Sequence, residues 1–349
     1  MRLIILKFAI NVAILIMVTS AFGQELTRDG RNRYSSPDIR LSSAVASGKI
    51  VSISSAVNLS GSLNIKAGDG QEATFSYNKI LKAPSESEAV DYASAIDATL
   101  ERTSQGARLI LQSPNPAPWS GTDYSGVIEG ELILPKDCRL DIDAQYFDLV
   151  ILGPFKSCEN KASFGRLEAR DITDMLYLTT SNRDIVVRDI TGEVSLTTSH
   201  ADIEINNLST LGRQAYLVNE NGSISGDGLS GIFDIKNSFG RIRLADLKLV
   251  SERSRISGSY SPVSLDIIGI NNAGLTVRNT NEDIRISIPK TLSASFSLRV
   301  DTNGEINVED IEMRPSLVDS NRLDFDTGTG GPRVRMSIRG DGNISIRGE

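Results

Sequence analysis

The sequence predicts an all-β protein, a parallel β-helix-like solenoid with rungs of about 18–22 residues. One phrase, a polar turn followed by alternating apolar residues, returns at Ile185, Ile203 and Ile224, at steps of 18 and 21 residues (203 − 185 and 224 − 203). A second alternating phrase, such as Val194-Ser195-Leu196, lies between the copies of the first. A polar corner with one apolar residue, such as Asp189-Ile190, ends many of the units. Each unit therefore offers two short strands and a corner.

Coiling explains the period. If each unit makes one turn, equivalent strands stack about 4.8 Å apart and pair in parallel, with one face buried. A single unit cannot bury its own apolar face, so it needs a neighbour on each side. A leucine-rich horseshoe is the alternative with a similar period, but no unit carries its asparagine spacing.

The chain begins with the features of an export signal over residues 1–23. Arg2 and Lys7 precede an apolar run over residues 8–18, and small residues lead to Gly23. An uncleaved membrane anchor is the alternative, although the run is shorter than the ~20 residues that a span requires. We expect a flexible leader and first strand over residues 24–55 and a single solenoid domain over residues 56–349. The mature protein is expected in the periplasm, on the cell surface or in the medium.

A helix and a hairpin are expected over residues 86–113, ahead of regular coils over residues 126–349. Ser85 and Glu88 have the spacing of a capping box, and an apolar helical face follows over residues 89–96. The alternation then changes to that of a strand, and a hairpin partner follows at residues 107–112. This helix and hairpin would cover one open end of the stack, whose strand edges are otherwise unpaired.

Two cysteines, Cys138 and Cys158, remain in the mature chain. An even count in an exported protein suggests a disulfide. If the two residues lie one coil apart, their separation suits a bridge. Two separate buried thiols are the alternative.

Charge excludes two classes of partner. The net charge is −7, and it becomes −9 once the two cationic residues of the signal are removed (−7 − 2). Nucleic acids and anionic membrane surfaces select basic patches, so neither is an expected partner. With one histidine and two cysteines, a Cys/His zinc site cannot be assembled, and no cofactor is expected.

Candidate site residues are few. His200, the only histidine, fills the turn slot that Asn182 occupies in a sister unit, so it is interpreted as a turn residue. Asp184 and Asp202 precede equivalent strands and would stack, which would let them share Ca²⁺ or act as an acid–base pair. The alternative for both is a solvated turn residue. Trp119 and Tyr124 could stack on a sugar ring, or could fold against the coils as a loop.

The corners at Asn281 and Asn303, the Ser/Thr-rich strands and the closing Gly340–Gly348 stretch resemble the bacterial putative-adhesin family, whose members carry β-strand repeats. The resemblance covers roughly residues 60–349. It implies an exported, right-handed parallel β-helix-like solenoid, related to the head domains of putative autotransporter adhesins, and it carries over no catalytic residues.

We therefore expect a non-catalytic envelope or secreted protein that presents a repetitive polar surface as an adhesin or scaffold. Its partner would be an envelope glycan or protein, and self-association is open. A polysaccharide-binding or polysaccharide-degrading β-helix protein is the alternative.

Overall fold

The computed structural model describes residues 25–161, 164–250, 253–301 and 303–349. These residues form strands β1–β27 and one helix, α1, so the predicted all-β class is confirmed. The expected export signal at residues 1–23 lies outside the described residues.

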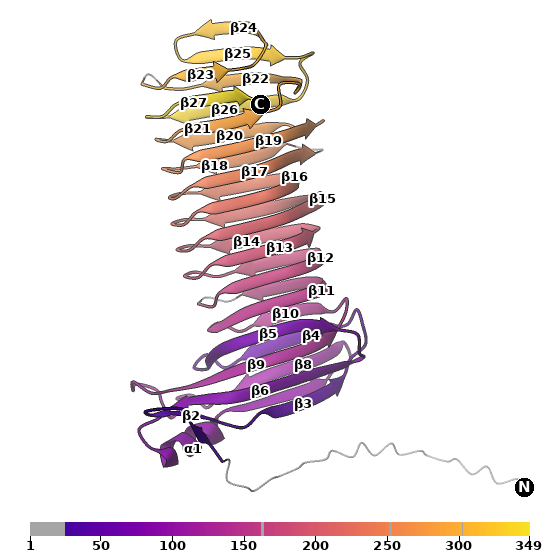
Figure 1. The fold of residues 1–349 in the computed structure, drawn as a ribbon, viewed down its shortest axis with the longest axis vertical. Helices are drawn as coiled ribbons and strands as arrows, with labels where there is room; N and C mark the ends of the chain where they lie inside the picture. The colour runs from indigo at the N-terminus through magenta and orange to yellow at the C-terminus, as the bar shows by residue number, and fades with distance from the viewer. Residues whose placement is uncertain (1–24, 162–163, 251–252, 302) are drawn as a thin grey trace, which may run out of the picture.

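Successive repeats pair in parallel, in the register that the sequence predicts. Ile185 lies beside Ile203, which lies beside Ile224 and then Ile242. Figure 1 shows the resulting stack of strands along the long axis. Each repeat contributes one strand to each of two walls, which we call the first wall and the second wall.

The strands of the first wall, in spatial order, are β6 (Glu72–Lys82), β9 (Ser125–Pro135), β5 (Ser60–Gly68), β11 (Phe147–Lys161), β12 (Leu167–Thr179), β13 (Ile185–Thr191), β15 (Ile203–Asn219), β16 (Ile224–Asn237), β17 (Ile242–Val250), β19 (Val263–Asn271), β21 (Ile284–Ile288), β27 (Ile344–Gly348) and β23 (Ile306–Glu309). Those of the second wall are β7 (Asp97–Arg102), β8 (Gly106–Gln112), β4 (Ile50–Ser55), β10 (Arg139–Asp143), the later parts of β11 and β12, β14 (Glu193–Thr198), the later parts of β15 and β16, β18 (Ser254–Gly258), β20 (Leu275–Thr280), β26 (Arg333–Arg339), β22 (Ala294–Arg299), β25 (Arg322–Thr327) and β24 (Met313–Asp319).

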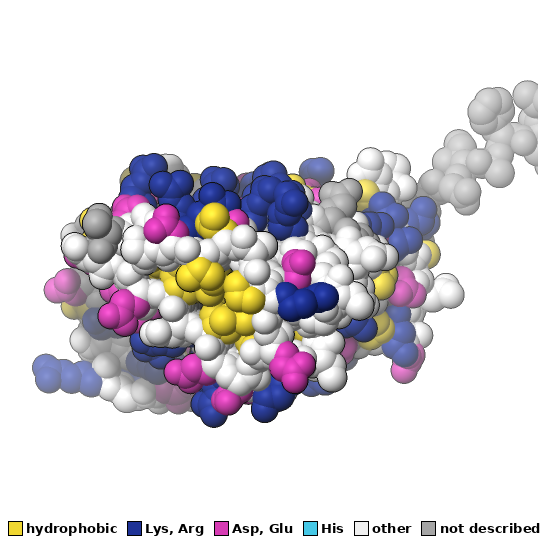
Figure 2. All heavy atoms as spheres, turned by 90° about the horizontal axis from the view of Figure 1, so that it is seen from above, with side chains coloured by type: hydrophobic (Ala, Val, Ile, Leu, Met, Phe, Trp, Pro, Cys, Tyr) yellow, Lys and Arg dark blue, Asp and Glu magenta, His cyan; other side chains and the backbone are white. Residues whose placement is uncertain are grey.

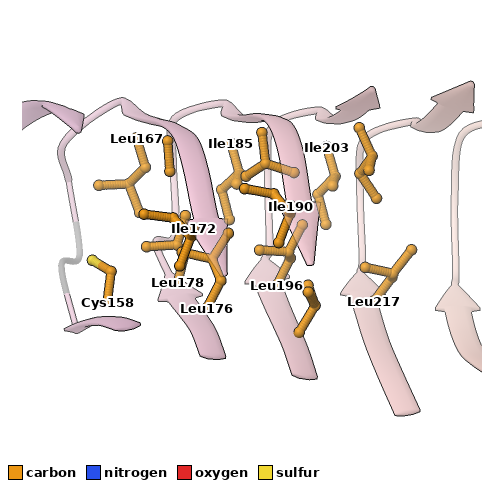
Figure 3. Packing of buried hydrophobic residues seen from close by; sticks show 14 of the residues in the cluster. Cys158, Leu167, Ile172, Leu176, Leu178, Ile185, Ile190, Leu196, Ile203 and Leu217 are labelled. Carbon is orange, nitrogen blue, oxygen red and sulfur yellow. The ribbon is translucent and has the colours of Figure 1, made fainter. Parts of the chain in front are cut away.

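Apolar side chains from both walls fill the space between them. Figure 3 shows the first-wall residues Leu167, Ile185 and Ile203 in line, with Leu176 and Leu196 of the second wall facing them. All five are at most 1% exposed. Burial of such a side chain stabilises the fold by roughly 1.5–3 kcal/mol, so each repeat adds an increment to one continuous core.

The polar corner that ends each unit, such as Asp189-Ile190, also repeats in register. Ile172, Ile190 and Leu208 are in register and buried. The residue before each of them, including Asp189 and Asn207, has a positive φ near 55°. Asp and Asn tolerate this left-handed conformation better than most residues, which explains why the corner phrase begins with them.

The spatial order of the coils departs from chain order at both ends of the stack. Strands β4 and β5 lie between β8/β9 and β10/β11. The closing strands β26 and β27 lie between β20/β21 and β22/β23. The last strands of the chain are therefore interior strands, and the segment that precedes them forms the terminal rung.

The N-terminal end is closed by a helix and antiparallel strands. Helix α1 (Glu86–Ala95) begins where the predicted helix and hairpin begin and has the predicted Ser85 cap, and β7 and β8 form the predicted hairpin. Strand β6 runs antiparallel to β9 and covers the edge of the first wall. Buried Lys79 ties the helix to β6, because its Nζ donates a hydrogen bond to the Ala93 carbonyl at 2.8 Å. Burial lowers the pKa of this amine.

The leader is more ordered than predicted. Residues 24–55 contain β1 (Thr27–Arg28), β2 (Arg33–Ser35), β3 (Ile39–Ala44) and β4. Strands β2 and β3 both pair with β6. The short alternation from Ile39 to Leu41 therefore forms an antiparallel strand and not a flexible leader.

The C-terminal end is closed by the antiparallel strands β25 and β24. Every residue of β24 is exposed, and its register shifts between Pro315 and Leu317. A proline and a bulge in an edge strand both oppose pairing with another chain. Figure 2 looks onto this end and shows an apolar patch with charged side chains around it.

The expected disulfide between Cys138 and Cys158 is not formed, and both thiols are buried and free. The strand register explains this, because Cys158 pairs with Leu140 and lies two positions further along the strand direction than Cys138. Two residues along the strand span roughly 6.6 Å, which combines at a right angle with the ~4.8 Å between strands to about 8 Å. The resulting separation exceeds the upper limit of about 6.8 Å for bridged Cα atoms. Burial raises the pKa of Cys138 to about 11 and also raises that of Cys158, so neither thiol is activated.

Candidate binding surface

Asp184 and Asp202 do stack, but they hydrogen-bond to backbone. Asp184 Oδ1 accepts the Asp202 N–H at 3.1 Å, and Asp202 Oδ1 accepts the Ser223 N–H at 2.7 Å. Asp148 and Asp283 accept backbone N–H groups in the same way at other coils. The structure therefore gives these aspartates the role of connecting one corner to the next.

This role predicts the effect of substitutions at Asp202. Asp202→Ala should destabilise the fold by about 1–2 kcal/mol, because the Ser223 N–H loses a charged acceptor. Asp202→Asn should cost less, since the amide oxygen can still accept that hydrogen bond. Urea unfolding followed by circular dichroism measures both. Equal losses in the two variants would show that the carboxylate charge matters rather than the hydrogen bond.

Trp119 does not present an open ring face. It is 7% exposed and packs edge-on against Tyr92 of α1, with ring centroids 5.6 Å apart. Tyr124 is partly buried against the same core. The loop alternative therefore describes these residues, since Trp119 is covered by the core and by the helix.

His200 lies in an exposed turn column whose other members include two stacked aromatic pairs. Tyr146 stacks on Phe164 at 5.0 Å, and Phe239 stacks on Tyr260 at 5.7 Å. All four rings are between 40% and 53% exposed. Their faces are turned toward each other along the stack, so they stabilise neighbouring corners. The phrase Phe-Gly-Arg, present at residues 164 and 239, is the sequence signal for these pairs.

The outer face of the first wall carries two neighbouring hollows that share lining residues, and we call the two together the trough. The larger has a volume of about 500 Å³ and the smaller about 380 Å³, and both are lined by Arg243 and Ala245. The trough crosses β15, β16, β17, β19, β21, β27 and β23 in spatial order. Six steps between strands give a length of roughly 29 Å along the axis.

Two adjacent columns of outward residues form the trough. One column runs through Ser225, Arg243, Ser264, Arg285 and Ser345. The other includes Asp227 and Ala245, then Asp266, Ser287 and Arg347. Small and long side chains alternate along both columns, and the positions of the small ones form the floor of the trough. Inward neighbours are buried apolar residues, so the alternation of each strand produces core and trough together.

The charged groups differ in how far they are already paired. Arg285 bonds Asp283 at 2.7 Å, and Arg347 Nε lies 3.6 Å from Asp310. Arg243, at the junction of the two hollows, makes no ion pair within the part of the chain that the structure describes. Its guanidinium is therefore available to a ligand.

Two carboxylates lie near Ser287. Ser287 Oγ donates to Glu349 Oε1 at 2.8 Å, and Asp266 is beside Ser287 in the same column. Burial raises the pKa of Asp266, and the charges of Glu349 and Asp246 raise it further. The described residues contain no group of three or more His, Cys, Asp or Glu side chains placed to hold a metal ion. None of their helices is long and apolar enough to cross a membrane.

Comparisons with known proteins find similar chains among solved structures alone. No family model and no curated protein matches this chain. A putative cell adhesion protein from Clostridium sporogenes is 11% identical and has a TM-score of 0.22, covering 90% of this chain and 100% of its own. A putative adhesin from Parabacteroides merdae is 8% identical with a TM-score of 0.28, covering 88% and 95%. One from Parabacteroides distasonis is 10% identical with a TM-score of 0.25, covering 89% and 97%.

The sequence resembles the putative-adhesin family, and these solved structures are described as putative adhesins or as a putative cell adhesion protein. Each TM-score lies below 0.3, so this likeness does not indicate what the chain binds.

Proposed function

We propose that this protein is an exported, non-catalytic adhesin, built as a right-handed β-solenoid rod that holds a surface polymer in the trough of its first wall. The observation that carries the proposal is the extent of the trough, whose lining residues come from seven neighbouring strands. A small metabolite would need one enclosed pocket. A long, shallow, polar trough instead suits an extended partner that makes the same contacts at several coils.

Export follows from the charged and apolar pattern of residues 1–23 and places the mature rod in the periplasm, on the cell surface or in the medium. An adhesin needs a rigid display surface and no chemistry. The apolar core holds the walls rigid, and the aspartates at the corners are engaged with backbone. Both features agree with a binding role.

Co-sedimentation tests this proposal. Purified mature protein, mixed with isolated envelope fractions or with intact foreign cells, should pellet with at least one of them. Pelleting should be unchanged by EDTA, because the stacked corner aspartates already accept backbone N–H groups. A protein that stays in the supernatant with every fraction and every cell type is not an adhesin. If EDTA abolishes pelleting, the protein binds through a calcium-dependent site and not through the trough.

Polysaccharide cleavage is the second candidate, and one observation favours it. Asp266 has a raised pKa and lines the same hollow as Glu349, and glycoside hydrolysis uses a pair of carboxyl groups. Release of reducing ends from polysaccharides that the protein retains tests this candidate. If Asp266→Asn abolishes such release while the rod stays folded, the protein is an enzyme.

A further inference from the structure

We infer that the polymer held in the trough is a neutral, linear polysaccharide, lying parallel to the long axis of the rod. This inference rests on the proposed function, since it names the ligand class of the same surface. Four features of the trough lead to it: its direction, its chemistry, its charge and its position on the wall.

The first feature is the direction of the trough along the axis of the rod. The outward columns repeat once per strand along the axis, and their members pair directly, as Ser264 with Arg285 and Arg285 with Ser345. A linear polymer laid along this line meets a hydroxyl or a planar charged group at each step. A polymer crossing the wall would meet only one strand and would leave most of the trough unused.

The second feature is the set of functional groups that line the trough. The side chains that line the trough are mainly guanidinium, carboxylate, amide and hydroxyl groups. A guanidinium offers parallel donors and a carboxylate offers parallel acceptors, and both can engage two neighbouring hydroxyls of a sugar ring. The serines of the floor both donate and accept hydrogen bonds. A hydroxyl-rich ligand can therefore satisfy every type of group present.

Charge decides between neutral and acidic sugars. Arginine contributes three positive charges to the trough, and Glu204, Asp227, Asp266, Glu309 and Glu349 contribute five carboxylates. The chain as a whole carries a net charge of −7. A polyanion would be repelled on approach and would face unpaired carboxylates once bound. A neutral glycan meets neither cost.

The position of the trough argues against an extended peptide. Peptides that add a strand need a free sheet edge. Most of the trough lies over interior strands of the first wall, where β17, β19, β21 and β27 each pair on both sides. Of the strands that the trough crosses, only β23 at the end of the wall pairs on one side alone in the described part of the chain, so recognition along most of the trough depends on side chains.

Affinity gel electrophoresis tests the inference on the full mature chain. Gels containing a neutral glucan, mannan or galactan should retard the protein in at least one case, and a polygalacturonate gel should not. Retardation should hardly change between about 50 and 300 mM NaCl, because no net charge is neutralised on binding. Retardation by polygalacturonate alone, or strong weakening by salt, would overturn the neutral assignment.

A matched pair of variants tests the location. Ser264→Tyr places a large side chain on the floor of the trough and should weaken retardation about tenfold or more. Thr276→Tyr makes an equivalent change on β20, on the other wall of the same coil, and should leave retardation unchanged. Circular dichroism and the urea midpoint establish that both are folded. Unchanged retardation of folded Ser264→Tyr would remove the trough as the site.

Envelope fractions separate this inference from the proposed function. If periodate treatment of the fraction abolishes pelleting and proteinase treatment does not, the glycan assignment holds. If proteinase abolishes pelleting and periodate does not, the protein remains an adhesin but its partner is a protein, and the glycan assignment is wrong. Absence of pelleting with untreated fractions and cells contradicts the proposed function itself.

Discussion

Replacing Ile344 by alanine should destabilise the protein by about 3–5 kcal/mol, whereas Ile306→Ala should cost only about 1–2 kcal/mol. Ile344 is fully buried and lies between Ile284 on one side and Ile306 on the other. Ile306 lies at the end of the same column and is only partly buried. Truncation of Ile344 therefore leaves a cavity in the interior of the stack, and truncation of Ile306 trims its end.

Urea unfolding of the two variants distinguishes the observed order of strands from a simple alternative. If the coils stacked in chain order, Ile306 would be the interior residue and Ile344 the terminal one, and the two losses would be reversed. Val318→Thr provides the control, because Val318 lies on the terminal strand β24 and is 74% exposed, so its loss should stay near zero.

Local pattern predicts the coils and cannot predict their order at the ends. The phrase around Ile344 has the same alternation as those around Ile203 and Ile284, so nothing in it distinguishes an interior rung from a terminal one. Strand β27 lies between β21 and β23. This order depends on which end of the stack the preceding hairpin of β24 and β25 covers, and that is a property of the assembled stack. The cysteine prediction fails for a related reason, since it needs a register correct to within two residues.

For the candidate binding surface, too, the sequence predicts some features and cannot predict others. The roles of Asp184 and His200 as corner residues follow from their repeated slots. The trough does not, because it joins residues from strands that are remote in sequence. Arg285 and Ser345 become neighbours only through the inserted strand β27. Sequence alone therefore indicates a polar outer face, while its hollow emerges from the register and from the alternation of small and long side chains.

The second large effect is expected at Asn279, which is 3% exposed on the inner side of a corner. Its amide donates hydrogen bonds to the carbonyls of Ser261 and Glu282, both at 2.9 Å. Asn279→Leu should cost about 2–4 kcal/mol, because the side chain fits the core by size and leaves these carbonyls without their donor. The urea midpoint, followed by circular dichroism, measures the loss.

Related corners supply the control and the reason for a polar residue inside an apolar core. Thr180 is equally buried and donates to the Gly165 carbonyl at 3.1 Å. Asn279→Thr can keep one such bond and should lose about half as much stability as Asn279→Leu. If the leucine variant is as stable as the parent, the corner requires a side chain of this volume and does not require the hydrogen-bond donor. If the carbonyls do need the donor, this column of Asn and Thr fixes where each strand of the first wall begins, and thereby keeps the outward columns of the trough in register.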